Sequence, residues 1–150
     1  MIDMVKERVH LNVKDYTEDP GPRYKRQDMD NTDTSGEMFY IRVLNGAFVD
    51  CLRNNKQLVL FLDGVSGYPS SFLDEAIGEL VYDFGKDKVQ EILSFETTMF
   101  KRRAKQVIEE TYPQWEKRRI NKDIVIHSPN INVTLNRLGS NGLIEEYLVP

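Results

Sequence analysis

Along the first hundred residues, segments in which apolar positions recur every second residue or form a short run alternate with segments in which they recur every three or four residues. Apolar side chains occupy every second position over residues 9–13, which predicts a half-buried strand. Between residues 39 and 52 they recur every three or four positions, which predicts a helix with one broad core-facing stripe and Ser35 as its N-cap. Residues 57–63 carry an apolar run that is typical of a central strand covered on both faces.

The pattern predicts a second helix between the serine pair at 70–71 and Gly85. Ser70 or Ser71 is expected to cap it, and Asp74 would complete a weak capping box with Ser71. Gly85 stands where a glycine commonly ends a helix. Gly78, inside the helix, costs about 1 kcal/mol relative to alanine, and the close approach of another backbone would explain its presence.

The remaining pattern predicts three further elements and a tail. A strand is expected near residues 92–95, and a third helix should run from a cap at Thr97 or Thr98 to about Thr111, where Pro113 limits it. Residues 123–128 have the composition of another short strand. Alternating apolar positions and a turn follow, which leaves residues 113–150 as a C-terminal extension of undecided role.

This order of elements predicts an α/β fold. Strands that alternate with helices favour a sandwich in which helices pack against a central, mostly parallel sheet. The 150 residues suit a single domain, 1–150. Residues 15–36 are polar and rich in turn formers, and are interpreted as a long loop.

Composition excludes several classes of protein. One cysteine excludes a disulfide framework, and two histidines leave little for a metal cluster, so neither a metal nor a cofactor is expected. The longest apolar run is far too short to span a membrane, and the first ten residues lack the apolar segment of a secretory signal. The expected location is therefore the cytoplasm.

The formal net charge of −4 is unevenly distributed. Residues 1–100 sum to −7 and residues 101–150 to +3, because eight basic side chains lie between 101 and 122. Tyr112 and Trp115 lie among them, so a nucleic-acid-associated protein is the alternative interpretation. The acidic total favours a solvated helix face, and nucleic acid is not the expected partner.

Several short motifs resemble one family. Asp63-Gly64-Val65 is followed by Ser70-Ser71-Phe72-Leu73-Asp74-Glu75-Ala76 and Gly78, and upstream stand Gly21-Pro22-Arg23-Tyr24 and Ser35-Gly36-Glu37-Met38-Phe39. Over about residues 20–100 this chain resembles the STAS-like domain family of unknown function found in bacteria and archaea. That family is related to the STAS fold of anti-sigma-factor antagonists, so the resemblance implies a STAS-like sandwich.

The resemblance also implies a phosphorylation switch. In the antagonists, a partner kinase phosphorylates a serine at the start of this helix, which corresponds to Ser71, with Ser70 as the second candidate. Pro69 and Phe72 depart from the flanking Asp and Gly of that pattern. A helix N-terminus favours an anion, whereas nearby Asp74 and Glu75 would repel one, and simple capping remains the alternative. The implied partner is a regulatory protein such as a histidine-kinase-like ATPase.

The expected interaction surface surrounds these serines. Its further residues are Asp63, Gly64, Tyr68, Asp74, Glu75, Arg23 and Tyr24. Asp63 is open to interpretation as a turn former, a partner contact or a catalytic acid, and Arg23 as a phosphate contact or part of a solvated loop. No nucleophile–base pair can be assembled, and Cys51 lies on an apolar stripe. The sequence therefore favours a non-enzymatic interaction or regulatory module.

Overall fold

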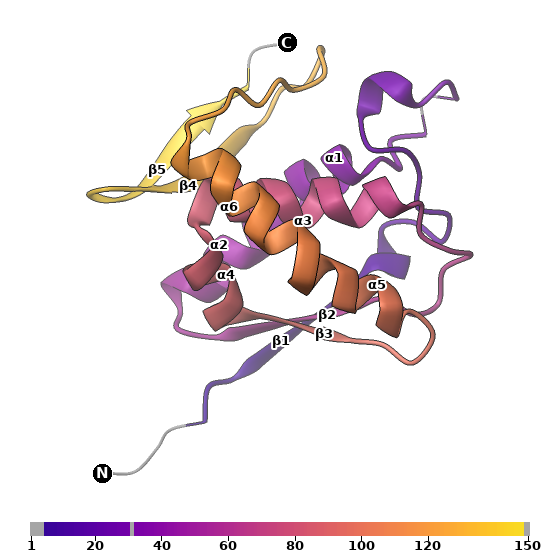
Figure 1. Ribbon diagram of the computed structural model, residues 1–150, viewed down its shortest axis with the longest axis horizontal. Helices are drawn as coiled ribbons and strands as arrows, with labels where there is room; N and C mark the ends of the chain where they lie inside the picture. The colour runs from indigo at the N-terminus through magenta and orange to yellow at the C-terminus, as the bar shows by residue number, and fades with distance from the viewer. Residues whose placement is uncertain (1–4, 31, 149–150) are drawn as a thin grey trace.

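The computed structural model describes residues 5–30 and 32–148, and its fold is α/β. A three-stranded parallel sheet carries the helices, and a separate two-stranded hairpin lies at the C-terminal end (Figure 1). The elements are β1 (Arg8–Asn12), η1 (Val13–Asp15), η2 (Lys25–Gln27), α1 (Gly36–Phe39), η3 (Tyr40–Leu44), α2 (Asn45–Arg53), β2 (Gln57–Phe61), α3 (Ser70–Phe84), α4 (Lys86–Ile92), β3 (Leu93–Glu96), α5 (Lys101–Gln106), η4 (Val107–Thr111), α6 (Tyr112–Ile120), β4 (Thr134–Gly139) and β5 (Gly142–Tyr147).

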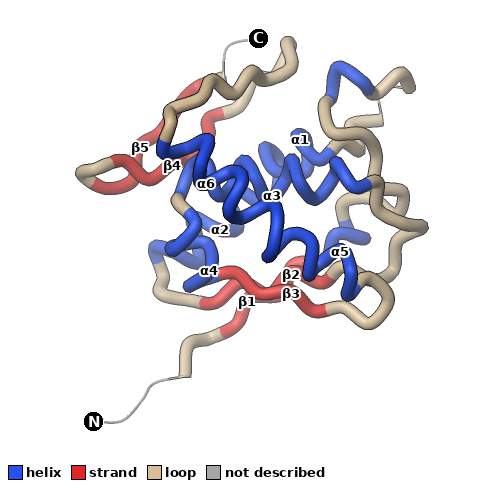
Figure 2. Tube along the Cα trace, in the orientation of Figure 1, coloured by secondary structure: helices blue, strands red, loops and turns tan. Residues whose placement is uncertain are grey.

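The parallel sheet has the strand order β1-β2-β3. Val59 pairs with His10 on one side and Ser94 on the other, so the central strand is β2, as expected. The connections β1 to β2 and β2 to β3 both move along the sheet in the same direction. Because such crossovers have the same handedness, their helices lie on the same face of the sheet. Figure 2 shows the helices on one side of this sheet. Leu58, Val59 and Leu60 alternate between its two faces and are all buried, so the middle of β2 is covered on both faces, as expected.

Residues 36–53 form one continuous helix with a π-helical segment, η3, in its middle. The Ser35 side chain accepts a hydrogen bond from the Met38 N–H at 3.1 Å, which confirms the predicted cap. The wider turn of η3 was not predicted, because hydrophobic periodicity does not resolve a single inserted residue. Cys51 is buried (1% exposed), as expected from its apolar stripe.

Helix α3 begins at Ser70, whereas a cap at Ser70 would have started the helix at Ser71. Pro69 is the N-cap, and no side-chain hydrogen bond caps the helix, so both predicted serine caps and the Ser71–Asp74 capping box are wrong. Proline already supplies the extended backbone that precedes the first turn, which leaves both serines inside the helix. Gly85 ends the helix with a φ of 87°, as predicted.

Residues 101–120 form one helix that continues past the predicted end near Thr111. Pro113 is tolerated because the π-helical segment η4 precedes it: the Tyr112 N–H bonds to the Val107 carbonyl, five residues back. Pro113 thus follows directly on a widened turn, where its missing N–H removes one hydrogen bond without ending the helix. The limit expected from this proline is therefore wrong.

Residues 123–128 form neither a helix nor a strand, so the strand predicted there is wrong. The alternating tail instead forms the β4–β5 hairpin, joined by a turn at residues 140–141. Leu135 and Leu148 are buried in the same core as the helices, and Asn45 exchanges two hydrogen bonds with the backbone of Asn136. Residues 134–147 thus neither extend the parallel sheet nor stand apart from the core.

Candidate functional site

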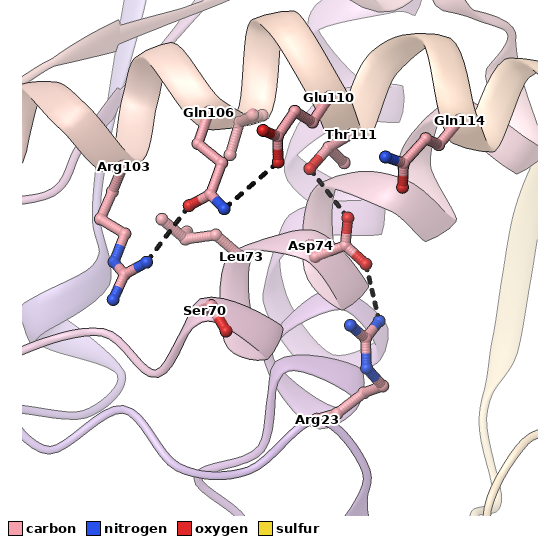
Figure 3. A pocket seen from close by; sticks show the side chains of 10 residues that line it. Arg23, Ser70, Leu73, Asp74, Arg103, Gln106, Glu110, Thr111 and Gln114 are labelled. Atoms are coloured by element: carbon pink, nitrogen blue, oxygen red, sulfur yellow. Dashed lines mark hydrogen bonds and ion pairs between the residues drawn. The ribbon is translucent and has the colours of Figure 1, made fainter.

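A cavity of about 210 Å³ opens beside the first turns of α3, and we call it the α3 pocket. It lies between α3, the loop that carries Arg23, and the helix formed by α5, η4 and α6 (Figure 3). Its lining is mostly polar, with two arginines and two carboxylates. The lining residues are Arg23, Ser70, Leu73, Asp74, Arg103, Gln106, Val107, Glu110, Thr111 and Gln114.

Asp74 is held in the pocket by three donors from two other parts of the chain. Arg23 Nη1 lies 2.8 Å from its Oδ2, the Thr111 hydroxyl 2.8 Å from its Oδ1, and Trp115 Nε1 3.3 Å from its Oδ2. Hydrogen bonds to an acidic side chain from several donors fix its geometry. Asp74 therefore ties the start of α3 to the Arg23 loop and to α6.

Arg23 is positioned by its own backbone as well as by its side chain. The Glu37 N–H donates to the Arg23 carbonyl at 2.9 Å, which fastens the long loop to the start of α1. The guanidinium also lies 3.1 Å from Glu75 Oε1, so one arginine bridges Asp74 and Glu75. Burial alone would lower the pKa of Arg23, but its hydrogen bonds to the two carboxylates outweigh burial and raise it.

Close packing at Gly78 brings Trp115 over α3. A Cβ at Gly78 would lie 2.1 Å from the indole, so glycine is the residue that lets this ring approach. The neighbour is therefore a side chain rather than the second backbone that the sequence suggested. It is also the side chain that donates to Asp74, so the glycine helps to build the pocket.

Ser70 and Ser71 differ in their access to the pocket. Ser70 is exposed and lines it, between Arg103 and Arg23 in Figure 3. Ser71 is partly exposed and is not part of the lining. The geometry therefore favours Ser70 over Ser71 as the serine whose modification would reach the two arginines.

Asp63 organises the connection between β3 and α5. Its carboxylate accepts hydrogen bonds from the Thr97 hydroxyl at 2.5 Å, the Thr98 N–H at 2.7 Å and the Met99 N–H at 3.1 Å. These hydrogen bonds, that from Thr97 above all, lower the pKa of Asp63. Thr97 in turn accepts a hydrogen bond from the Phe100 N–H at 2.8 Å, which shapes the turn before α5.

Two residues of the expected interaction surface are buried. Tyr68 is 5% exposed: its hydroxyl donates to the Leu62 carbonyl at 2.6 Å and its ring packs on Phe72, so it anchors the loop. Glu75 is 1% exposed. Neither offers a side chain to a partner of the folded protein, and their placement on a surface was wrong.

Tyr24 and Gly64 remain accessible but belong to different surroundings. The Arg26 guanidinium covers the Tyr24 ring at 3.9 Å from its centroid, in the loop beside Arg23. Gly64 is exposed in the loop after β2, next to the side chain of Lys14. The structure thus brings together Arg23, Asp74, Glu75 and Ser70, and leaves Asp63 and Gly64 in the adjoining loop.

The basic residues between 101 and 122 largely engage their own helix. Arg118 lies over the Trp115 ring at 4.0 Å, and Arg119 pairs with Glu116 at 2.5 Å. Arg103 instead turns into the α3 pocket and donates to Gln106. No observation on the described residues favours a nucleic-acid surface here.

Sequence reasoning missed a row of acidic side chains on α3, which we call the carboxyl row: Glu75, Glu79 and Asp83. The first two are at most 2% exposed, and Glu79 Oε1 lies 2.6 Å from His127 Nε2. Tyr40 donates to Asp83, and burial raises the pKa of Asp83 to about 7. Acidic residues spaced by four inside an otherwise apolar helix were the signal available in the sequence.

A second cavity, of about 140 Å³, lies at the far end of this row. Its lining residues are Glu79, Tyr82, Asp83, Val125, His127, Arg137 and Glu146. Across residues 5–30 and 32–148, no group of three His, Cys, Asp or Glu side chains is arranged to hold a metal ion. Nor does any helix of that part of the chain have the length and apolar character needed to cross a membrane.

Comparison with known proteins identifies the central segment. Residues 35–98 match the family model of a STAS-like domain of unknown function, which confirms the resemblance over α1 to β3. The match begins at Ser35, so the Arg23–Tyr24 segment lies outside it. No curated protein and no solved structure was found to match the chain.

Proposed function

We propose that this STAS-like protein is a non-catalytic regulatory module that binds a partner protein through the α3 pocket and the adjoining loop 64–69. The observation that carries the proposal is the position of Ser70, an exposed hydroxyl at the mouth of a pocket with two arginines. Binding residues are often carried by loops that a rigid element holds in place. The loop before α3 is of this kind, because it leads directly into the helix.

The switch is phosphorylation of Ser70 by the partner, with a histidine-kinase-like ATPase as the partner class that the resemblance suggests. A phosphoryl group adds about −1.5 to −2 charges at neutral pH. Arg103 and the N-terminal turn of α3 favour that charge, whereas Asp74 opposes it and competes for Arg23. Modification therefore redistributes the ion pairs of the pocket, and the partner reads the altered surface.

Mass spectrometry of the protein purified from its native host tests this proposal. We expect a species heavier by about 80 Da whose extra mass maps to Ser70. Ser70→Ala should abolish it, and Ser71→Ala, the matched control one residue away, should keep it. A modification that maps to Ser71 would contradict the proposal. The proposal also fails if no modification is found under any growth condition and Ser70→Ala and Ser70→Asp capture the same partner proteins in pull-down experiments.

A further inference from the structure

The interior of the protein contains more acidic than basic side chains around the middle of α3. The residues of the carboxyl row are four positions apart and therefore share one face of the helix. Glu37, from α1, is also buried (0% exposed). Arg23 reaches Glu75 and no further, so the remaining carboxyl groups have no guanidinium in hydrogen-bond contact among the described residues.

Glu79 is the centre of this cluster. Its Oε1 faces His127, while its Oε2 is buried without a hydrogen-bond donor. Glu75 lies one helical turn before Glu79 on the same face of α3, so the two carboxyl groups are neighbours. Two carboxylate groups cannot hydrogen-bond to each other unless one of them carries a proton, so a proton between them explains the otherwise unpaired oxygen.

The charges that face Glu79 come from every element packed around it. Glu75 and Asp83 extend from α3 itself, Glu37 from α1, and His127 from the segment that follows α6. Arg137 and Glu146 line the second cavity from the hairpin, 3.9 Å apart and paired with each other. Burial first, and then the negative neighbours, raise the pKa of Glu79 well above its usual range.

His127 belongs to residues 121–133, which we call the connecting segment. This segment is held to the core by the Ser128 N–H, which donates to Glu37 Oε2 at 2.9 Å, and by the Tyr82 hydroxyl, which donates to the Asp123 carbonyl at 2.5 Å. The contact of His127 with Glu79 differs from these because it joins an imidazole directly to a buried carboxyl group. Three isoleucines on or beside the segment, at 120, 124 and 126, are more than 60% exposed.

We propose that Glu75, Glu79 and His127 share a buried proton that holds the connecting segment on α3, and that loss of this proton to solvent at rising pH releases the segment. With the proton present, Glu79 donates to Glu75 and accepts from the His127 ring N–H. Without it, two buried carboxylates face each other beside a neutral imidazole, and their repulsion displaces Glu79 from His127. This device operates whether or not Ser70 is modified.

Amide hydrogen exchange of the full chain, followed by NMR, tests the proposal. The Ser128 N–H is the reporter because it is buried against Glu37, and its rates are corrected for the intrinsic pH dependence of exchange. We expect its protection to fall at least tenfold between pH 6 and pH 9. In Glu79→Gln the side-chain amide donates and accepts in the same positions without titrating, so protection should change by less than a factor of two.

The matched control is Glu146→Gln, which removes a carboxyl group from the same cavity at an exposed position and should keep the wild-type dependence. Flat protection in the wild type, or an unchanged fall in Glu79→Gln, would overturn the proposal. If Glu79→Gln does not fold, carbon-13 titration of the wild type decides. A shared proton makes the Glu79 carboxyl and the His127 ring shift together, whereas independent midpoints contradict the sharing.

Discussion

Acidic side chains near the start of α3 and further along it lie in opposite surroundings. Asp74, whose side chain is 25% exposed, has an arginine, a hydroxyl and an indole as donors. Glu79 is buried and Asp83 is partly buried; neither has a guanidinium in hydrogen-bond contact among the described residues, and burial raises the pKa of both. The comparison teaches that the groups packed around one helix decide whether an acidic side chain is held by donors or has its pKa raised by burial.

The largest effect is expected where the two regions meet, at Gly78. Gly78→Ala places a methyl group 2.1 Å from the Trp115 ring, which must then move away from both Gly78 and Asp74. Overpacking of this kind should lower the free energy of unfolding by about 3 kcal/mol. Urea denaturation measures the loss.

The control for this substitution is Gly46→Ala, in α2. A Cβ at Gly46 meets nothing within 4 Å, so the change should raise stability by about 0.5–1 kcal/mol. Equal effects at the two glycines would show that the packing of Trp115 does not join the two regions.

A smaller loss of stability is expected when Arg23, the cation that pairs with Asp74 and Glu75, is removed. Arg23→Ala leaves the buried Glu75 without its cation, which should cost about 2 kcal/mol of unfolding free energy, because the guanidinium itself is partly exposed. The second change Glu75→Gln should recover part of that loss in a double-mutant cycle. Arg26→Ala, on the exposed neighbour, should cost less than about 0.5 kcal/mol, and a similar cost for both arginines would contradict the role of the bridge.

The smallest effect concerns the buried region and depends on pH. A folded-state pKa of about 7 for Asp83 lies above the unfolded value, so its stabilising contribution is complete below the unfolded pKa and is lost as pH rises through 7. Between pH 6 and pH 8 the wild type should therefore lose about 1 kcal/mol more than Asp83→Asn. Denaturation at pH 6, 7 and 8 measures this difference.

Asp87→Asn, at an exposed position of α4, is the control for the pH experiment and should follow the wild-type curve. If the stability of Asp83→Asn follows the wild-type curve too, Asp83 does not release a proton in this pH range. Glu79 would then be the one acidic residue of the pair that differs from Asp74 in this way.

The elements themselves were largely predictable from local signals. The cap at Ser35, the central position of residues 57–61 and the end of α3 at Gly85 follow from patterns spanning a few residues, and the structure confirms each. The start of α3 was not predicted, because Pro69 and two serines compete for the cap and their order is decided by backbone geometry.

The candidate site was predictable only in part. Arg23 and Asp74 were both named, but 51 positions separate them, and no sequence pattern states that they touch. The strand expected at residues 123–128 lacks a partner because His127 and Ser128 are used by Glu79 and Glu37 instead. Hydrophobic periodicity carries no information about such long-range hydrogen bonds.

By itself, the sequence determined the class of fold, the helix faces and strand that build its core, and the STAS-like segment, since these depend on hydrophobic spacing and short motifs. Only the tertiary structure decided which acidic side chains are buried and which groups neutralise them. The physical reason is that charge is costly only where water is excluded, and Glu79 is buried among groups from α1, the connecting segment and the hairpin.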